Sequence, residues 1–249
     1  MTPYFLDQPL TGLEGVVTGD LEVNQPHLDG DNTQDRMGVL YQPLAEFISK
    51  TISQGKRPVS IAGDCCTSIG VLAGLQHAGI KPNLIWFDAH GDFNTWETTP
   101  SGFLGGMPLA MLVGRGEQTI PEAVHLDPIS ETEVILTDAR DLDPGEKEAL
   151  AASHVAHISN VEDLLNFPLG EGPLYIHFDT DIINPREAPA MNYAASGGPT
   201  VKTLKRVVQH LAQTSCILAV SLSSWNPSLD HDGRSKTVSM NLLHTLLER

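Results

Sequence analysis

The sequence predicts an α/β fold over residues 1–249, a single domain in which helices cover both faces of a mostly parallel sheet. Short apolar segments of β-prone residues alternate along the chain with longer segments of helical periodicity. No linker, repeat or low-complexity tract divides the 249 residues, a length that one large α/β domain accommodates. Together these observations predict a three-layer α/β/α arrangement.

Six apolar, β-prone segments are expected to form the strands of this sheet. They are residues 59–62, 84–87, 134–137, 155–158, 174–178 and 217–222. Helical patterns are found at residues 34–53, 67–77, 104–113, 145–152, 161–165, 201–212 and 235–247. In the last of these, Val238, Leu242 and Leu246 recur at helical spacing, so that face is expected to pack on the sheet. Residues 1–33 show only weak periodicity and receive no assignment.

The overall composition argues against several classes of function. The net charge of −16 argues against a nucleic-acid binder, which needs a basic face. No apolar run is long enough to span a membrane, and the N-terminus lacks the pattern of a signal peptide. Three cysteines do not suggest a disulfide framework, so we expect a protein of the reducing cytoplasm.

Two short carboxylate runs, each directly after an expected strand, are the most informative feature of the chain. The first contains Asp88, His90 and Asp92, and the second contains Asp179 and Asp181. Alternate residues of an extended segment point the same way, so each run is expected to converge on one point. Converging carboxylates repel one another unless a cation lies between them, and this ligand chemistry suits a pair of hard divalent ions such as manganese. Solvated turns at strand ends are the alternative, which explains one such run more easily than two.

These motifs resemble those of the ureohydrolases, the family of arginase and agmatinase. Residues 88–95 read DAHGDFNT, similar to the arginase segment D-A-H-x-D-x-N-T. Residues 177–185 read HFDTDIINP, similar to S-F-D-x-D-x-x-D-P. The segments GGPT at 197–200 and WNP at 225–227 resemble the later G-G-L-T and V-N-P. Because the matches keep their order, the resemblance implies an arginase-like fold and a hydrolase that acts on linear amidines.

The resemblance also implies a binuclear centre that holds two Mn²⁺ ions. The ligands that it implies are Cys65, Asp88, His90, Asp92, Asp179 and Asp181. Asp88 and Asp179 would bridge the ions, while Asp92, Asp181 and His90 would also serve catalysis. The nucleophile would be a hydroxide that bridges the two ions.

Three positions depart from the arginase pattern. Cys65 stands where the family's G-G-D-H-S segment has a histidine ligand; a thiolate can bind metal, although a buried, non-ligating cysteine is the alternative. Gly105 stands where arginases have a histidine that shuttles protons. Ser224 stands where they have a glutamate that pairs with the substrate guanidinium. Because a buried cation without a counter-charge is costly, we expect a substrate head group less cationic than guanidinium.

Other cysteines and histidines receive lesser roles. Cys66 is interpreted as a structural neighbour of the site and Cys216 as a core residue. His177 shares a strand face with Asp179, so it is expected to support the metal ligands. His231 could replace the missing proton shuttle, but a solvated loop histidine is the preferred interpretation.

The residues that hold the amino-acid end of the substrate are partly retained. The resemblance maps Asp143 and Glu146 onto the contacts of the α-amino group, and Asn94 and Ser101 onto those of the α-carboxylate. Asp143 and Glu146 also read as the N-cap and capping box of a helix, and both interpretations can hold. Phe103 replaces a further polar contact.

These features predict hydrolysis of Nω-hydroxy-L-arginine to hydroxyurea and L-ornithine, since the added oxygen lets the head group bind uncharged. An arginase acting on L-arginine is disfavoured by Gly105 and Ser224, and an agmatinase-like enzyme by the retained Asp143 and Glu146. A non-catalytic arginase-like metal-binding protein is disfavoured by the intact carboxylates. We expect a small-molecule amino-acid substrate, no nucleic-acid or membrane partner, and a monomer, because no segment remains after the last helix to reach a second subunit and the net charge opposes self-association.

Overall fold

The computed structural model describes residues 22–24, 26–27 and 30–248, so most of the unassigned N-terminal segment lies outside the described residues. Its centre is a six-stranded sheet in the order β1-β6-β5-β2-β3-β4, in which every neighbouring pair is parallel. The strands are β1 (Val59–Ile61), β2 (Asn83–His90), β3 (Val134–Asp141), β4 (Ala156–Ile158), β5 (Leu174–Asp179) and β6 (Ile217–Ser223). The predicted α/β class and the six predicted strands are confirmed.

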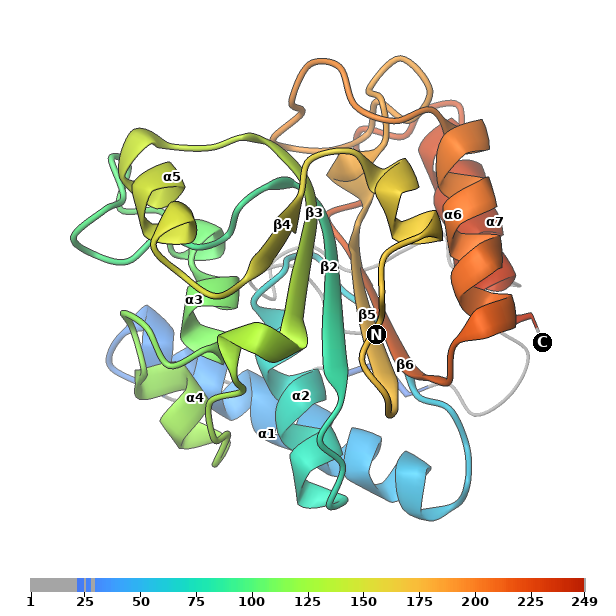
Figure 1. The fold of residues 1–249 in the computed structure, drawn as a ribbon. Helices are drawn as coiled ribbons and strands as arrows, with labels where there is room; N and C mark the ends of the chain where they lie inside the picture. The colour runs from blue at the N-terminus through green and yellow to red at the C-terminus, as the bar shows by residue number, and fades with distance from the viewer. Residues whose placement is uncertain (1–21, 25, 28–29, 249) are drawn as a thin grey trace.

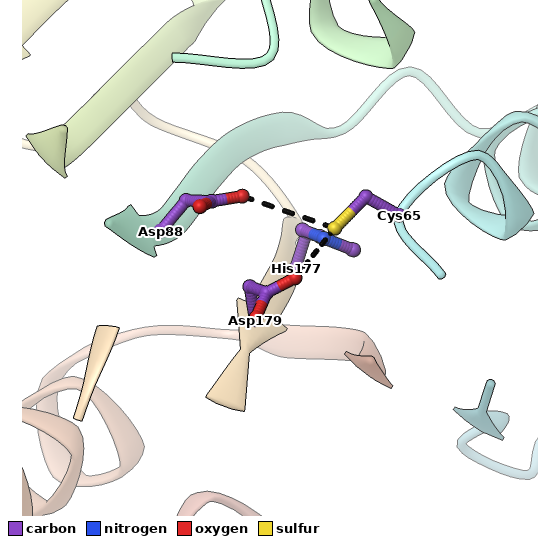
Figure 2. A group of neighbouring side chains, drawn as sticks. All are labelled: Cys65, Asp88, His177 and Asp179. Atoms are coloured by element: carbon purple, nitrogen blue, oxygen red, sulfur yellow. Dashed lines mark hydrogen bonds between the residues drawn. The ribbon is translucent and has the colours of Figure 1, made fainter. Parts of the chain in front are cut away.

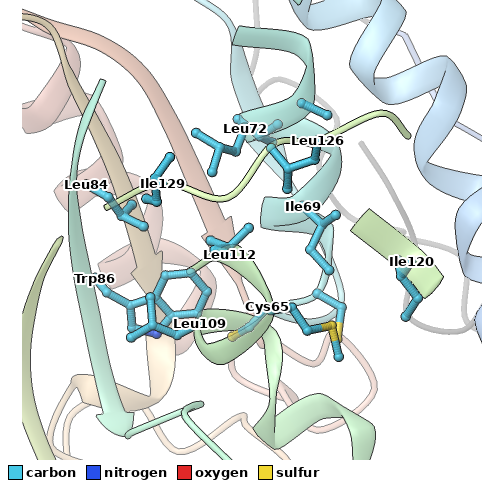
Figure 3. Packing of buried hydrophobic residues seen from close by; sticks show 14 of the residues in the cluster. Cys65, Ile69, Leu72, Leu84, Trp86, Leu109, Leu112, Ile120, Leu126 and Ile129 are labelled. Atoms are coloured by element: carbon cyan, nitrogen blue, oxygen red, sulfur yellow. The ribbon is translucent and has the colours of Figure 1, made fainter. Parts of the chain in front are cut away.

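Helices cover both faces of the sheet (Figure 1). The α-helices are α1 (Thr33–Ser53), α2 (Thr67–His77), α3 (Pro108–Leu112), α4 (Thr119–Ala123), α5 (Pro144–Ala151), α6 (Val201–Thr214) and α7 (Arg234–Leu247). Alternate residues of β2 belong to different cores, as the strand period requires. Leu84 and Trp86 pack in a cluster with α1, α2 and α3 (Figure 3). Ile85 and Phe87 pack in a second cluster with α6 and α7.

Close packing of α2 against α1 fixes the segment that enters the site. Gly74 of α2 meets α1 so closely that an added Cβ would lie 2.5 Å from the carbonyl oxygen of Ala45. Every residue of α2 from Thr67 to Leu75 is buried, as expected for a helix held between α1 and the sheet. Because α2 begins one residue after Cys66, this packing also holds the Cys65-Cys66 pair in place.

Several local features differ from the sequence-based expectation. The helix expected over residues 104–113 is a 3₁₀ turn at Leu104–Gly106 followed by α3, because Pro108 has no N–H and starts a new helix instead of continuing the turn. The segment Val161–Leu165 is 3₁₀ rather than α-helical. Helix α4 and the 3₁₀ turns Glu131–Glu133 and Thr180–Ile182 were not predicted.

Cys216 is exposed, so its assignment to the core is wrong. It lies in the connection between α6 and β6, where its carbonyl oxygen accepts a hydrogen bond from the N–H of Leu174. The expected apolar face of α7 is confirmed: Leu242 and Leu246 are buried, and Val238 packs against the same cluster. No helix in the described part of the chain is long and apolar enough to cross a membrane.

Candidate metal centre

The site lies at the carboxyl ends of the central strands, where an open parallel sheet usually binds its ligands. Strand β2 ends with Asp88 and His90, and its neighbour β5 ends with His177 and Asp179. Cys65 enters from the loop after β1. That loop is shaped by the buried carboxylate of Asp64, which accepts the N–H of Cys66 at 2.8 Å. The topology therefore brings three separate segments to one point.

Strand alternation explains only part of this convergence, which corrects the sequence-based argument. Strand β2 ends at His90, and Asp92 lies beyond it with a left-handed backbone (φ 49°). Asp181 belongs to the 3₁₀ turn that follows β5, and the Oδ1 atom of Asp179 accepts the N–H of Asp181 at 2.8 Å. Asp92 and Asp181 thus reach the site through turns that leave the sheet, and both line the same cavity.

One group of possible ligands consists of Cys65, Asp88, His177 and Asp179, whose donor atoms all lie within 4.8 Å of one another (Figure 2). The Sγ atom of Cys65 donates a hydrogen bond to Oδ2 of Asp179 at 2.7 Å and lies 3.8 Å from Oδ2 of Asp88. All four residues are buried. A thiol, an imidazole and two carboxylates in this arrangement could enclose a metal ion.

A second group consists of Asp88, His90 and Asp181. The Nδ1 atom of His90 lies 3.0 Å from Oδ2 of Asp181 and 3.4 Å from Oδ1 of Asp88. Burial alone would lower the pKa of His90, but hydrogen bonds to these two carboxylates raise it to about 12. Because Asp88 belongs to both groups, it is placed to bridge two ions.

Burial makes the metal-free cluster electrostatically unfavourable. Burial, together with the charge of Asp181, raises the pKa of Asp179 to about 7. Burial and the charge of Asp88 raise the pKa of Asp181 to about 6. The pKa of the Cys65 thiol is raised well above its usual value by burial and by the charge of Asp179. A divalent cation would stabilise the deprotonated form of all three groups.

Asp92 supplies the most specific indication that a cation fits here. Its Oδ2 atom is buried and has no hydrogen-bond partner among the described residues. Such an orphaned carboxylate oxygen is unfavourable in a protein interior unless a cation or water satisfies it. Asp92 belongs to neither of the two groups above but lines the cavity over them, so the donor set fits a pair of divalent ions.

A cavity of about 520 Å³ opens over these residues and is also lined by all five residues expected to bind substrate. They are Asn94, Ser101, Asp143, Glu146 and Ser224. The Nδ2 atom of Asn94 donates to Oδ2 of Asp143 at 2.9 Å, which joins the two ends of the expected amino-acid subsite. The five residues that the motifs indicated thus line one cavity, and their contacts with substrate stay a prediction.

Glu146 has a structural task that limits its role toward substrate. Its two carboxylate oxygens accept the N–H groups of Phe93 at 2.8 Å and of Asp143 at 3.1 Å. The predicted capping box at the start of α5 is confirmed, with Asp143 as the N-cap. Burial raises the pKa of Glu146 to about 7. Glu146 thus ties the loop after β2 to helix α5. Asp143 also accepts hydrogen bonds, from Asn94 and from the first turn of α5, but it is the less buried carboxylate of the pair.

Ser224 follows β6 and faces the candidate metal ligands. Its backbone is left-handed (φ 66°), which is uncommon for a residue with a side chain and frequent at functional sites. Its hydroxyl donates a hydrogen bond to Oδ2 of Asp179, and the Sγ atom of Cys65 lies 3.9 Å away. The side chain expected to meet the substrate head group is therefore neutral and held against a candidate metal ligand.

Phe103 and Tyr193 form an aromatic wall beside Gly105, the position at which arginases have the histidine that shuttles protons. A Cβ added at Gly105 would lie 2.4 Å from Cζ of Phe103, so the ring fills the space that a side chain there would need. Phe103 packs against Tyr193 with ring centroids 5.0 Å apart. The sequence analysis missed Tyr193 and its neighbour Asn192, because nothing local marks the loop before Gly197 as part of the cavity. His231 is exposed.

A parallel α/β sheet with buried thiol, imidazole and carboxylate groups at its strand ends defines a candidate metal-dependent hydrolase. Comparison with known proteins gives the family: the arginase family model matches residues 2–248, and the chain belongs to this family. It is 28% identical to the arginase of Bacillus subtilis over 244 residues, covering 92% of this chain and 82% of that protein. It is also 28% identical over 247 residues to the arginase of Bacillus caldovelox, covering 92% of this chain and 83% of that one.

Solved structures agree with this assignment. A crystal structure of Bacillus subtilis arginase superimposes with a TM-score of 0.82 at 26% identity, covering 92% of this chain and 84% of that chain. The native structure of Bacillus caldovelox arginase gives 0.80 at 26% identity, covering 94% and 83%. The protein is thus an arginase-family amidinohydrolase with a candidate metal site.

Proposed function

We propose that this protein hydrolyses Nω-hydroxy-L-arginine to hydroxyurea and L-ornithine at a centre that holds two Mn²⁺ ions. The observation that carries the proposal is the environment of the substrate head group. At position 224, where arginases have a glutamate, this chain has a serine. The Ser224 hydroxyl is already hydrogen-bonded to Asp179. A guanidinium would enter without that counter-charge, whereas a hydroxyguanidine can enter uncharged.

The metal ligands of the proposal are Cys65, Asp88, His90, Asp92, Asp179 and Asp181. When bound, two divalent ions lower the pKa of a water molecule enough to make it a nucleophile near neutral pH. The chain itself holds the surrounding groups in place. Oδ1 of Asp181 accepts the N–H of Ala89 at 3.1 Å while Oδ2 contacts His90, so this carboxylate is fixed at both oxygens.

The cavity residues would orient the substrate. Asp143 would accept a hydrogen bond from the α-amino group, and Asn94 and Ser101 would hold the α-carboxylate. The hydrogen bond between Asn94 and Asp143 keeps these groups at a constant separation. Phe103 and Tyr193 also line this cavity. The proton required by the departing ornithine amine would not come from position 105, which is glycine.

The pathway and compartment are part of the same proposal. Cysteine at position 65 together with glycine at position 105 resembles the Nω-hydroxy-L-arginine amidinohydrolase of D-cycloserine biosynthesis. The hydroxyurea formed would then serve antibiotic biosynthesis. A reducing cytoplasm would keep Cys65, Cys66 and Cys216, which are free cysteines, in the thiol form.

The first test is product analysis with the purified protein. Chelator-treated protein is given Nω-hydroxy-L-arginine or L-arginine, with and without Mn²⁺, and hydroxyurea, urea and ornithine are quantified. We expect hydroxyurea and ornithine in equal amounts, only when metal is present, and we expect Asp179→Asn to abolish both. A higher kcat/KM for L-arginine would make the protein an arginase, the alternative that its arginase relatives favour. No product from either substrate would indicate a non-catalytic metal-binding protein.

A further inference from the structure

His177 is the buried histidine that the proposed function leaves without a task. It lies on β5, two residues before Asp179, and is 1% exposed. One of its ring nitrogens lies within 4.8 Å of the Sγ atom of Cys65 and of carboxylate oxygens of Asp88 and Asp179. In Figure 2 its ring lies beside the Cys65 sulfur, between Asp179 and the loop that carries the cysteine. The imidazole is thus part of the candidate donor set rather than a distant neighbour.

The hydrogen bonds of the ring indicate which nitrogen faces the site. Nδ1 lies 2.8 Å from the hydroxyl of Ser221, which lies 2.7 Å from the hydroxyl of Tyr175. Nε2 has only a long contact, 3.4 Å, to the hydroxyl of Ser223. That same Ser223 hydroxyl lies 3.1 Å from Asp179 and 3.3 Å from Cys65, so Nε2 points to the cluster.

The arrangement around Nδ1 is the one that metal-binding histidines usually have. Such a histidine uses one ring nitrogen for the metal and holds the other with a hydrogen bond that fixes the orientation of the ring. Here Ser221 and Tyr175 supply that support. The ring also stacks on Trp86, with centroids 3.8 Å apart and an interplanar angle of 27°.

Two departures from the arginase motifs meet at this point. The histidine of G-G-D-H-S is Cys65 here, and the serine of S-F-D-x-D is His177. The two side chains approach the same two carboxylates from different segments, Cys65 from the loop after β1 and His177 from β5. Exchange of histidine for cysteine on one segment is therefore matched by the gain of a histidine on the other.

We propose that Nε2 of His177 binds the same metal ion as the thiolate of Cys65. This inference rests on the binuclear centre of the proposed function and adds His177 to its metal ligands. One thiolate, one imidazole and two carboxylates make a four-donor set that is softer than the carboxylate-rich partner site. The Cys65 site should therefore bind Zn²⁺ or Cd²⁺ more tightly than Mn²⁺.

Cadmium NMR tests this bond directly in the intact chain of 249 residues. Protein grown with nitrogen-labelled histidine is stripped with chelator and loaded with a spin-active cadmium isotope. The thiolate-bound cadmium is recognised by its strong downfield shift. We expect its signal to be split by one imidazole nitrogen, and the second cadmium signal to be split by the nitrogen of His90.

Variants then assign the splitting. His177→Gln should remove the splitting of the thiolate-bound cadmium, keep that of the other ion, and weaken binding at the Cys65 site by about ten-fold or more. His157→Gln is the matched control: His157 lies on β4, where its Nε2 contacts the carbonyl of Asp138, so its loss should change neither signal. If His177→Gln does not fold, the splitting of the thiolate-bound cadmium signal in the wild-type protein still shows whether an imidazole binds that ion.

The outcomes separate this inference from the proposed function. Two cadmium signals, with the thiolate-bound one unsplit in the wild type, would overturn the role of His177 and leave the metal centre in place. Splitting that survives in His177→Gln would also overturn it. A protein that binds no cadmium would remove the metal centre itself, and the proposed function with it.

Discussion

Substituting Gly105 by alanine tests whether the aromatic wall occupies the place of a proton-shuttle side chain. The added Cβ would lie 2.4 Å from Cζ of Phe103, about 1 Å inside ordinary van der Waals contact. The Phe103 ring must therefore move, which weakens its packing on Tyr193, worth about 0.5–1.5 kcal/mol. With the strain of overpacking, we expect a loss of about 1–3 kcal/mol of unfolding free energy. This corresponds to a fall in Tm of roughly 2–12 °C for a chain of this size.

The assay is thermal or urea unfolding of a double-mutant cycle. Phe103→Ala should remove the conflict, so that Gly105→Ala costs at least about 1 kcal/mol less in that background. Gly106→Ala is the matched control, because its Cβ would meet only Nδ2 of Asn94 at 3.9 Å. If Gly105→Ala is as stable as Gly106→Ala, or costs the same with and without Phe103, the aromatic wall does not occupy that space.

Three further predictions concern the pH dependence of stability, the choice of substrate and the oligomeric state. In the metal-free folded protein, burial raises the pKa of Asp179 to about 7 and that of Asp181 to about 6. In the unfolded chain both carboxyl groups lose their protons near pH 4. The free energy of unfolding should therefore fall as the pH rises from about 4 to about 7. Divalent metal should therefore raise Tm more above pH 7 than near pH 5, and an equal gain at both would contradict the buried-carboxylate account. Ser224→Glu should shift relative kcat/KM toward L-arginine by about 2 kcal/mol, roughly thirty-fold, whereas Ser224→Gln should not; equal ratios for the two variants would show that position 224 does not face the head group. Sedimentation equilibrium should give a monomer mass, because the apolar face of α7 is already covered and the net charge is −16, and a trimer mass at micromolar concentration would refute this.

The fold could be predicted from the sequence because its signals are local. Most strands are short apolar segments between turn residues, and the long helices α1, α6 and α7 each have an apolar stripe of helical period. The break before α3 could also have been predicted, because Pro108 cannot continue a helix from the preceding turn. The short α4 helix, at Thr119–Ala123, is too brief to establish a period and was missed.

The site was only partly predictable because its geometry depends on turns and on contacts between distant segments. Strand alternation accounts for Asp88 and His90, but Asp92 reaches the cavity through a left-handed backbone and Asp181 through a 3₁₀ turn. Neither conformation follows from residue pattern alone. The same holds for the packing of Phe103 on Tyr193, which joins residues of two loops.

His177 illustrates most clearly the difference between what local sequence patterns predict and what tertiary contacts decide. The strand pattern correctly placed it on the face of Asp179, which suggested a supporting role. Its distance from Cys65 depends on how the loop after β1 folds over the sheet, and that loop is fixed by Asp64 and by the packing of α2. Sequence reasoning identified the residue, and only the tertiary structure brought it to the cysteine.

The most direct test of the proposed substrate is internal competition. Equal concentrations of Nω-hydroxy-L-arginine and L-arginine are supplied together to the metal-loaded protein, and the initial ratio of hydroxyurea to urea gives the ratio of the two kcat/KM values. Because Ser224 leaves a guanidinium without its counter-charge, we predict that hydroxyurea exceeds urea by at least ten-fold, a difference of about 1.4 kcal/mol. Urea formed at an equal or greater rate would contradict the proposed substrate.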